Sequence, residues 1–148
     1  ELMITVAIIG LLATIALPMA ELGVQRSREQ ELHLALREIR NALDAYKAAV
    51  EDGRIERTLG KSGYPPTLGV LVDGVPDIKS ADRKSRIYFL RKIPRDPMFD
   101  DASVPDEETW GKRCYASAAD APDEGEDVFD VYSLSSGSGL NGIPYRNW

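Results

Sequence analysis

An uninterrupted apolar run near the amino terminus constrains the fold more than any other feature. Leu2 to Ala20 contains 19 residues, of which 15 are Ala, Val, Ile, Leu or Met and none is charged. At about 1.5 Å per residue, a helix of this length measures about 28 Å, close to the hydrocarbon thickness of a bilayer. A cleavable signal peptide has a basic start and a shorter apolar segment, whereas this run follows Glu1. The run predicts a membrane-spanning helix, with a signal sequence or a buried core helix as the alternative.

The charge balance and the scarcity of Cys and His exclude several classes of function. The chain has 18 Lys and Arg against 24 Asp and Glu, a net charge of −6. Proteins that bind nucleic acid need a basic face, so we expect no nucleic-acid partner. A single Cys excludes a disulfide or a thiolate zinc cluster within these residues, and a single His leaves little for a catalytic triad. We therefore expect no enzymatic activity, no cofactor and no metal site.

The helical pattern continues beyond the apolar run. Apolar residues recur every three or four positions at Leu32, Leu36, Ile39, Leu43, Tyr46 and Val50. This spacing places them in one stripe along a helix. Gly53 can adopt the left-handed conformation that ends a helix, so one helix is expected from residue 2 to about residue 52. Pro18 should kink or locally open it. The stripe should pack against the domain that follows, and a coiled coil is the alternative.

Residues 53–148 predict a small domain with short elements. We expect a helical turn at Thr67–Val72, a short helix at Ser80–Lys92, and strands at Arg113–Ala118 and Val128–Leu134. The tail ends in Ile143, Tyr145 and Trp148, which should dock on the domain. The expected fold class is α+β. Its parts are a transmembrane segment (1–20), an amphipathic continuation (21–52) and a globular head (53–148).

The segment from Glu1 to Pro18 resembles the amino-terminal helix of type IV pilins and type II secretion pseudopilins. The head resembles the major pseudopilin, through Gly63-Tyr-Pro65, Tyr88-Phe-Leu90, Ile93-Pro-Arg-Asp-Pro97, Trp110-Gly111, Asp130-Val-Tyr-Ser-Leu134 and Asn147-Trp148. The resemblance implies a pilin-like fold, in which a long helix packs on a small antiparallel sheet. It also implies that a methylated Phe and three further residues precede Glu1.

This resemblance implies a structural subunit of a pseudopilus-like filament in a type II secretion-type machine. The partners would be further copies in a helical homopolymer, minor pseudopilins, an inner-membrane assembly platform and a prepilin peptidase. The chain would cross the bacterial inner membrane once, with a periplasmic head, before extraction into the filament. Arg26 and Arg28 alone favour a cytoplasmic head, but the basic leader of the family reverses that balance. A major or minor pilin, or a membrane-anchored periplasmic binding module that does not polymerise, is the alternative.

Three residues are candidates for assembly: Glu1, Gly10 and Pro18. A carboxylate in hydrocarbon costs about 2.5–3.5 kcal/mol. The resemblance implies that Glu1 pairs with the amino terminus of a neighbouring subunit, and snorkelling to the headgroups is the alternative. Gly10 and Pro18 bracket a stretch expected to melt in a filament, with a tolerated kink as the alternative.

One feature departs from the family. Major pseudopilins usually hold calcium with aspartates in the loop after the Tyr-Ser-Leu strand, but here Ser135–Asn141 contains no carboxylate. Calcium prefers several charged oxygen ligands, so we expect none to bind there. The acidic loop should be solvated, and a loop that binds a cation is the alternative. Its carboxylates are Asp120, Asp123, Glu124, Glu126, Asp127 and Asp130.

His33 and Cys114 fall on different predicted elements, so a thiol–imidazole pair is not expected. We expect a solvated His33 and a small buried Cys114. Trp148 should close the core rather than bind a partner.

Overall fold

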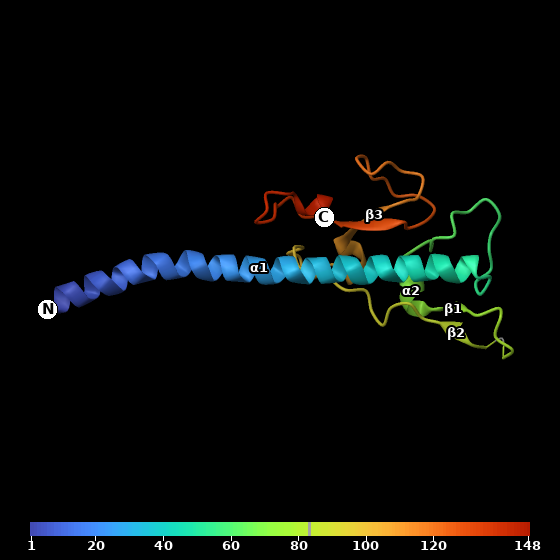
Figure 1. Cartoon of the computed structure of the whole chain (residues 1–148), viewed down its shortest axis with the longest axis horizontal. Helices are drawn as coiled ribbons and strands as arrows, with labels where there is room; N and C mark the ends of the chain where they lie inside the picture. The colour runs from blue at the N-terminus through green and yellow to red at the C-terminus, as the bar shows by residue number, and fades with distance from the viewer. Residues whose placement is uncertain (83) are drawn as a thin grey trace.

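The computed structural model describes residues 1–82 and 84–148, and for Leu17 only its place in the helix. In chain order the elements are α1 (Leu2–Glu51), α2 (Gly69–Asp73), β1 (Val75–Pro76), β2 (Arg86–Ile87), the 3-10 helix η1 (Asp106–Thr109), β3 (Trp110–Arg113), β4 (Asp130–Ser133) and the 3-10 helix η2 (Tyr145–Asn147). Figure 1 shows α1 as a long rod whose carboxy-terminal half carries all the other elements. The α+β class and the single long helix are confirmed.

Helix α1 ends as the sequence predicts. The Asp52 amide donates to the Ala48 carbonyl at 2.8 Å, and Gly53 follows with φ +68°. Helical backbone continues through Pro18, so the expected local opening is absent from the isolated chain. Figure 1 shows only a gentle curve along the amino-terminal third of α1. A proline removes one amide donor from a helix, and here the neighbouring turns keep the helix continuous.

The apolar stripe of α1 forms the centre of the core. All six of its residues are buried, and Leu32, Leu36, Ile39 and Leu43 are each 2% exposed or less. From the head, the buried residues Leu68, Leu71, Leu90, Trp110, Val128 and Val131 complete the cluster. Burying a large aliphatic side chain stabilises a fold by about 1.5–3 kcal/mol. The stripe therefore packs on its own head, as predicted, and is not available to a coiled coil.

Two small antiparallel sheets flank α1. Val75 pairs with Ile87 in the first sheet, and Trp110 pairs with Ser133 in the second. Strand β4 lies within the predicted segment Val128–Leu134, but β3 begins at Trp110, three residues before its prediction. The chain turns directly after β3, because Ser117 donates from its amide and hydroxyl to the Cys114 carbonyl, at 3.2 and 3.0 Å.

The predicted helix at Ser80–Lys92 is wrong. Its described residues contain strand β2, and the amides of Phe89 and Leu90 both donate to the Leu71 carbonyl at 3.0 Å. Asp77, rather than Ser80, organises the preceding turn, since its carboxylate accepts the Lys79 amide at 3.1 Å. Pairing with α2 and β1 therefore outweighs the local helix preference. The predicted turn at Thr67–Val72 is confirmed as α2, shifted slightly along the chain.

Candidate functional site

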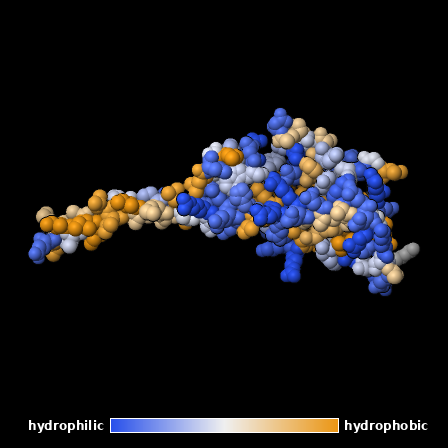
Figure 2. All heavy atoms as spheres, in the orientation of Figure 1, coloured by the Kyte–Doolittle hydropathy of each residue, from blue (hydrophilic) through white to orange (hydrophobic). Residues whose placement is uncertain are grey.

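The candidate functional site is the amino-terminal half of α1, which projects from the head with its apolar side chains uncovered. Met3 is 88% exposed, and the other large apolar side chains described between Leu2 and Val24 are 46–82% exposed. Figure 2 shows this half as an orange rod attached to a largely blue head. Within the described residues, α1 is the one helix long and apolar enough to cross a membrane.

The helix itself satisfies the two threonine hydroxyls within the apolar run. The Thr5 hydroxyl donates to the carbonyls of Glu1 and Leu2 at 3.1 and 2.9 Å, and the Thr14 hydroxyl donates to Leu11 at 2.6 Å. Hydroxyls bonded back to the helix leave no unpaired donor in hydrocarbon. Glu1 is exposed, and its side chain makes no capping hydrogen bond. Over residues 1–20 the site is thus an apolar cylinder with one carboxylate, Glu1, at its tip.

The structure places Glu1, Gly10 and Pro18 along one helix without bringing them together. Nine residues separate Glu1 from Gly10, which is about two and a half turns, so the two lie on opposite sides of α1. A Cβ added to Gly10 would meet nothing within 4 Å. Gly10 therefore opens a shallow notch in the cylinder, and nothing within the isolated chain requires a glycine there.

Polar contacts join the tail to α1 where the exposed half enters the head. The Tyr145 hydroxyl donates to Glu29 Oε1 at 3.0 Å, and Gln25 Nε2 donates to Tyr145 Oη at 3.1 Å. The Leu140 amide donates to the same Glu29 oxygen at 2.9 Å. Tyr145 is buried, and burial raises the pKa of its phenol.

The predicted docking of Tyr145 is confirmed, whereas that of Ile143 is wrong because its side chain is 46% exposed. Sequence reasoning also missed Gln25 and Glu29. Their spacing carried a usable signal, because positions 25 and 29 extend the stripe of Leu32 and Leu36 by the same steps of three and four. Polar residues in register with an apolar stripe indicate a helix face that is covered by hydrogen-bonding groups.

Trp148 covers the next section of the same helix. Its indole stacks on His33 with ring centroids 4.2 Å apart, and Arg40 donates to the Trp148 carbonyl at 2.9 Å. His33 was expected to be solvated. It is exposed, but one face of its ring packs against Trp148, so the expectation is only partly right. Cys114 is only half-buried, beside Gly125.

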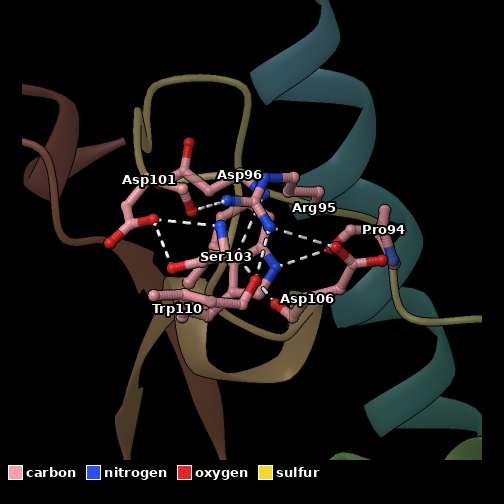
Figure 3. A network of polar contacts seen from close by, with 9 residues as sticks. Pro94, Arg95, Asp96, Asp101, Ser103, Asp106 and Trp110 are labelled. Carbon is pink, nitrogen blue, oxygen red and sulfur yellow. Dashed lines mark hydrogen bonds and ion pairs between the residues drawn. The ribbon is translucent and has the colours of Figure 1, made fainter.

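A second polar network fixes the loop before β3 (Figure 3). Arg95 donates to the Val104 carbonyl at 2.7 Å and to Asp106 at 3.3 Å, while the Trp110 indole donates to the Pro94 carbonyl at 2.7 Å. Asp96 is fully buried and accepts hydrogen bonds from Ser133 Oγ at 2.6 Å and the Met98 amide at 2.8 Å. Burial raises the pKa of the Asp96 carboxyl. The segment Ile93–Pro97 thus holds the loop against the β3–β4 sheet.

Several carboxylates of the acidic loop have protein partners. Glu126 pairs with Lys61, and Asp127 accepts the Tyr115 amide at 2.8 Å. Asp130 pairs with Arg40 at 2.8 Å. Across residues 1–82 and 84–148, no group of three His, Cys, Asp or Glu side chains is arranged to hold a metal ion.

The loop Ser135–Asn141 uses its side-chain oxygens internally. Ser135 Oγ accepts the Gly137 amide at 3.2 Å, and Asn141 Oδ1 accepts the Ile143 amide at 2.9 Å. The carboxylate of Glu29 reaches the loop from α1, and it already accepts hydrogen bonds from the Leu140 amide and the Tyr145 hydroxyl.

Comparisons with protein-family models, curated proteins and solved structures found no match to this chain. The function is therefore inferred from the geometry of α1 and its head.

Proposed function

We propose that this chain is a structural subunit of a pseudopilus-like filament in a type II secretion-type machine, and that it polymerises through the amino-terminal half of α1. One observation carries the proposal: a single continuous helix is bare and apolar over its first half and forms the core of the head over its second. A rigid rod of this kind moves with its head, so apolar contacts made by the rod position the head.

The apolar side chains of this half must be shielded from water both in the membrane and in the filament. A helix that is apolar all round is stable in lipid or inside a bundle of similar helices. We infer that lipid covers it while the chain is anchored in the inner membrane with a periplasmic head, and that neighbouring copies cover it in the filament. Transfer between these two settings exchanges one apolar environment for another.

Glu1 supports polymerisation over simple anchoring. A carboxylate at the tip of an apolar run disfavours insertion, so a plain anchor gains nothing from it. In the proposed filament Glu1 forms an ion pair with the amino terminus of a neighbouring copy. Gly10 and Pro18 provide the notch and the weak point that let adjacent helices approach closely.

The proposed partners are further copies of the chain, minor pseudopilins, the membrane assembly platform and the peptidase that matures the chain. The proposal assigns no catalytic role, because the conspicuous polar clusters of the head hold its loops in place. Glu29 holds the tail loop, and Asp96 holds the loop before β3.

The test is filament formation by the full-length chain, expressed with its peptidase and assembly platform. Sheared filaments are counted by electron microscopy for the wild type, for Glu1→Ala, and for Glu31→Ala as a control at an exposed carboxylate of the same helix. We expect filaments from the wild type and Glu31→Ala, and at least a tenfold loss for Glu1→Ala with normal membrane insertion. Filaments at wild-type yield from Glu1→Ala would contradict the assembly role of this residue.

A further inference from the structure

We propose that a groove at the junction of α1 and the head binds an anionic phospholipid of the membrane that α1 spans. The groove has a volume of about 510 Å³ and is lined by Ala20, Glu21, Val24, Arg28, Met98 and Tyr145, among others. This inference rests on the membrane-spanning role in the proposed function, and it assigns a ligand to a surface outside the assembly contacts.

The position of the groove along α1 places it at the bilayer surface. The apolar run ends at Ala20, and Val24 lies about 6 Å further along the helix axis. The headgroup layer on each side of a bilayer is about 5–8 Å thick, so Val24 falls within it. Arg28 lies one turn beyond, and side chains of a helix tilt toward its amino terminus. Arg28 also lines the groove, and its long side chain can extend back toward the lipid phosphates.

The walls of the groove match the upper part of a lipid. Val24 and Met98 are apolar and only partly covered, so they suit the glycerol and the first methylenes of an acyl chain. The hydroxyl of Tyr145 already donates to Glu29, which leaves its ring as an apolar wall. An open groove with these walls would otherwise expose apolar surface to water.

The charges at the junction favour an anion near Arg28. Glu29 has its carboxylate occupied by donors from Leu140 and Tyr145. The ion pairs among the described residues involve the cations Arg40, Lys47, Arg54, Lys61, Arg95 and Arg113. Arg26 and Arg28 are exposed and belong to none of these pairs. A guanidinium binds phosphate through two parallel hydrogen bonds, so an anionic headgroup suits Arg28.

Glu21 sets the orientation of the lipid. Its carboxylate lies on the same groove, two turns nearer the membrane than Arg28, and would repel a phosphate. The headgroup is therefore expected at the Arg28 end, with the apolar part of the lipid along Val24 and Met98.

The experiment places a benzophenone amino acid at Val24, which is 57% exposed, in the full-length chain in nanodiscs. The discs contain phosphatidylethanolamine with or without phosphatidylglycerol, and photoadducts are identified by mass spectrometry. A probe at Leu34, an exposed position about 15 Å further along the helix, is the control. We expect phosphatidylglycerol adducts at position 24 and at most traces at position 34. Arg28→Gln should reduce the phosphatidylglycerol adduct about fivefold, and Arg37→Gln should leave it unchanged.

Several results would overturn the proposal. A photoadduct between two copies of the chain would make the groove a subunit contact. Equal lipid labelling at positions 24 and 34, or no effect of Arg28→Gln, would remove the specific site. Alkaline extraction of the same samples separates this failure from failure of the proposed function. An inserted chain without lipid adducts refutes only the lipid site, whereas a chain that is not inserted refutes both.

Discussion

Tyr145 donates a hydrogen bond from its hydroxyl to the carboxylate of Glu29 across 3.0 Å, although 116 residues separate the two in the chain. The Leu140 amide donates to the same carboxylate oxygen at 2.9 Å. Glu29 therefore holds the tail loop onto α1 through hydrogen bonds to its carboxylate.

Removing the Tyr145 hydroxyl should weaken the head. Tyr145→Phe leaves a partly buried charge with one donor fewer, and hydrogen bonds to charged groups contribute about 1.5–3 kcal/mol. We expect a loss of this size in urea unfolding of a soluble fragment that begins at Val24 and so keeps Gln25. The control is Tyr88→Phe, because Tyr88 is 63% exposed and its loss should change stability by less than about 0.5 kcal/mol. Equal effects of the two variants would contradict the role of the Glu29 contact.

Calcium should not stabilise the head. A ligand that binds only the native state raises its melting temperature, and a hard dication needs charged oxygens. The loop Ser135–Asn141 has no carboxylate of its own, and Glu29 is already occupied. We expect the same melting temperature in excess chelator and in millimolar calcium. A rise of several degrees with calcium would show a site, and the acidic loop 120–130 would be the first place to look.

The extent of α1 and its buried stripe could be predicted because a long periodic pattern ends at a clear stop, Gly53. The strands of the head could not be placed well, since each has only two to four residues and offers little periodic signal. Ser80–Lys92 shows the reason most directly. Its local preference is helical, but its backbone pairs with the Leu71 carbonyl and with β1, which no local pattern reveals.

The same limit applies to the candidate site. The exposed apolar half of α1 was evident from the sequence, whereas Gln25 and Glu29 acquire a role only through a tail more than 100 residues away. The assembly roles of Glu1, Gly10 and Pro18 stay predictions, because their proposed partners are other chains.

A charge in the apolar stripe should unfold the head. Leu43 is 1% exposed, so Leu43→Asp buries a carboxylate among aliphatic side chains without a partner. We expect a loss of at least about 4 kcal/mol, measured by urea unfolding of the fragment that begins at Val24. The matched control is Leu34→Asp on the same helix, because Leu34 is 62% exposed and its replacement should be nearly neutral. Similar stability of the two variants would indicate that the stripe is not covered by the head.

Asp96 should make the head less stable as pH rises. Burial raises the pKa of its carboxyl above the ordinary value of 3.8, despite hydrogen bonds from Ser133 and the Met98 amide. A group whose pKa is raised in the native state adds its full stabilisation of the fold below the unfolded pKa. This stabilisation is lost as pH rises through the native pKa. Asp96→Asn keeps the shape of the side chain and removes the charge. Relative to wild type, this variant should gain stability as pH rises from the unfolded pKa of about 3.8 through the raised native pKa.

Asp101→Asn is a control of opposite sign. Hydrogen bonds from the Ser103 hydroxyl and amide lower the pKa of the Asp101 carboxyl. The stabilisation that Asp101 gives the fold is therefore present above the unfolded pKa and is lost as pH falls through the native pKa. Melting temperatures across the same pH range should show Asp101→Asn losing stability at neutral pH, with the deficit closing in acid. An Asp96→Asn curve parallel to wild type would contradict the inferred cost of burying this carboxylate.

The most direct test of the filament proposal is a cryo-electron microscopy reconstruction of sheared filaments made by the full-length chain with its assembly platform. The account predicts a helical homopolymer in which residues 2–20 of successive copies pack around the axis and the heads face outward. It also predicts that Glu1 lies within ion-pair distance of the amino terminus of a neighbouring copy. Filaments held together by their heads, with the apolar halves of α1 away from the axis, would contradict it, as would a chain that stays in the membrane as a monomer when the platform is active.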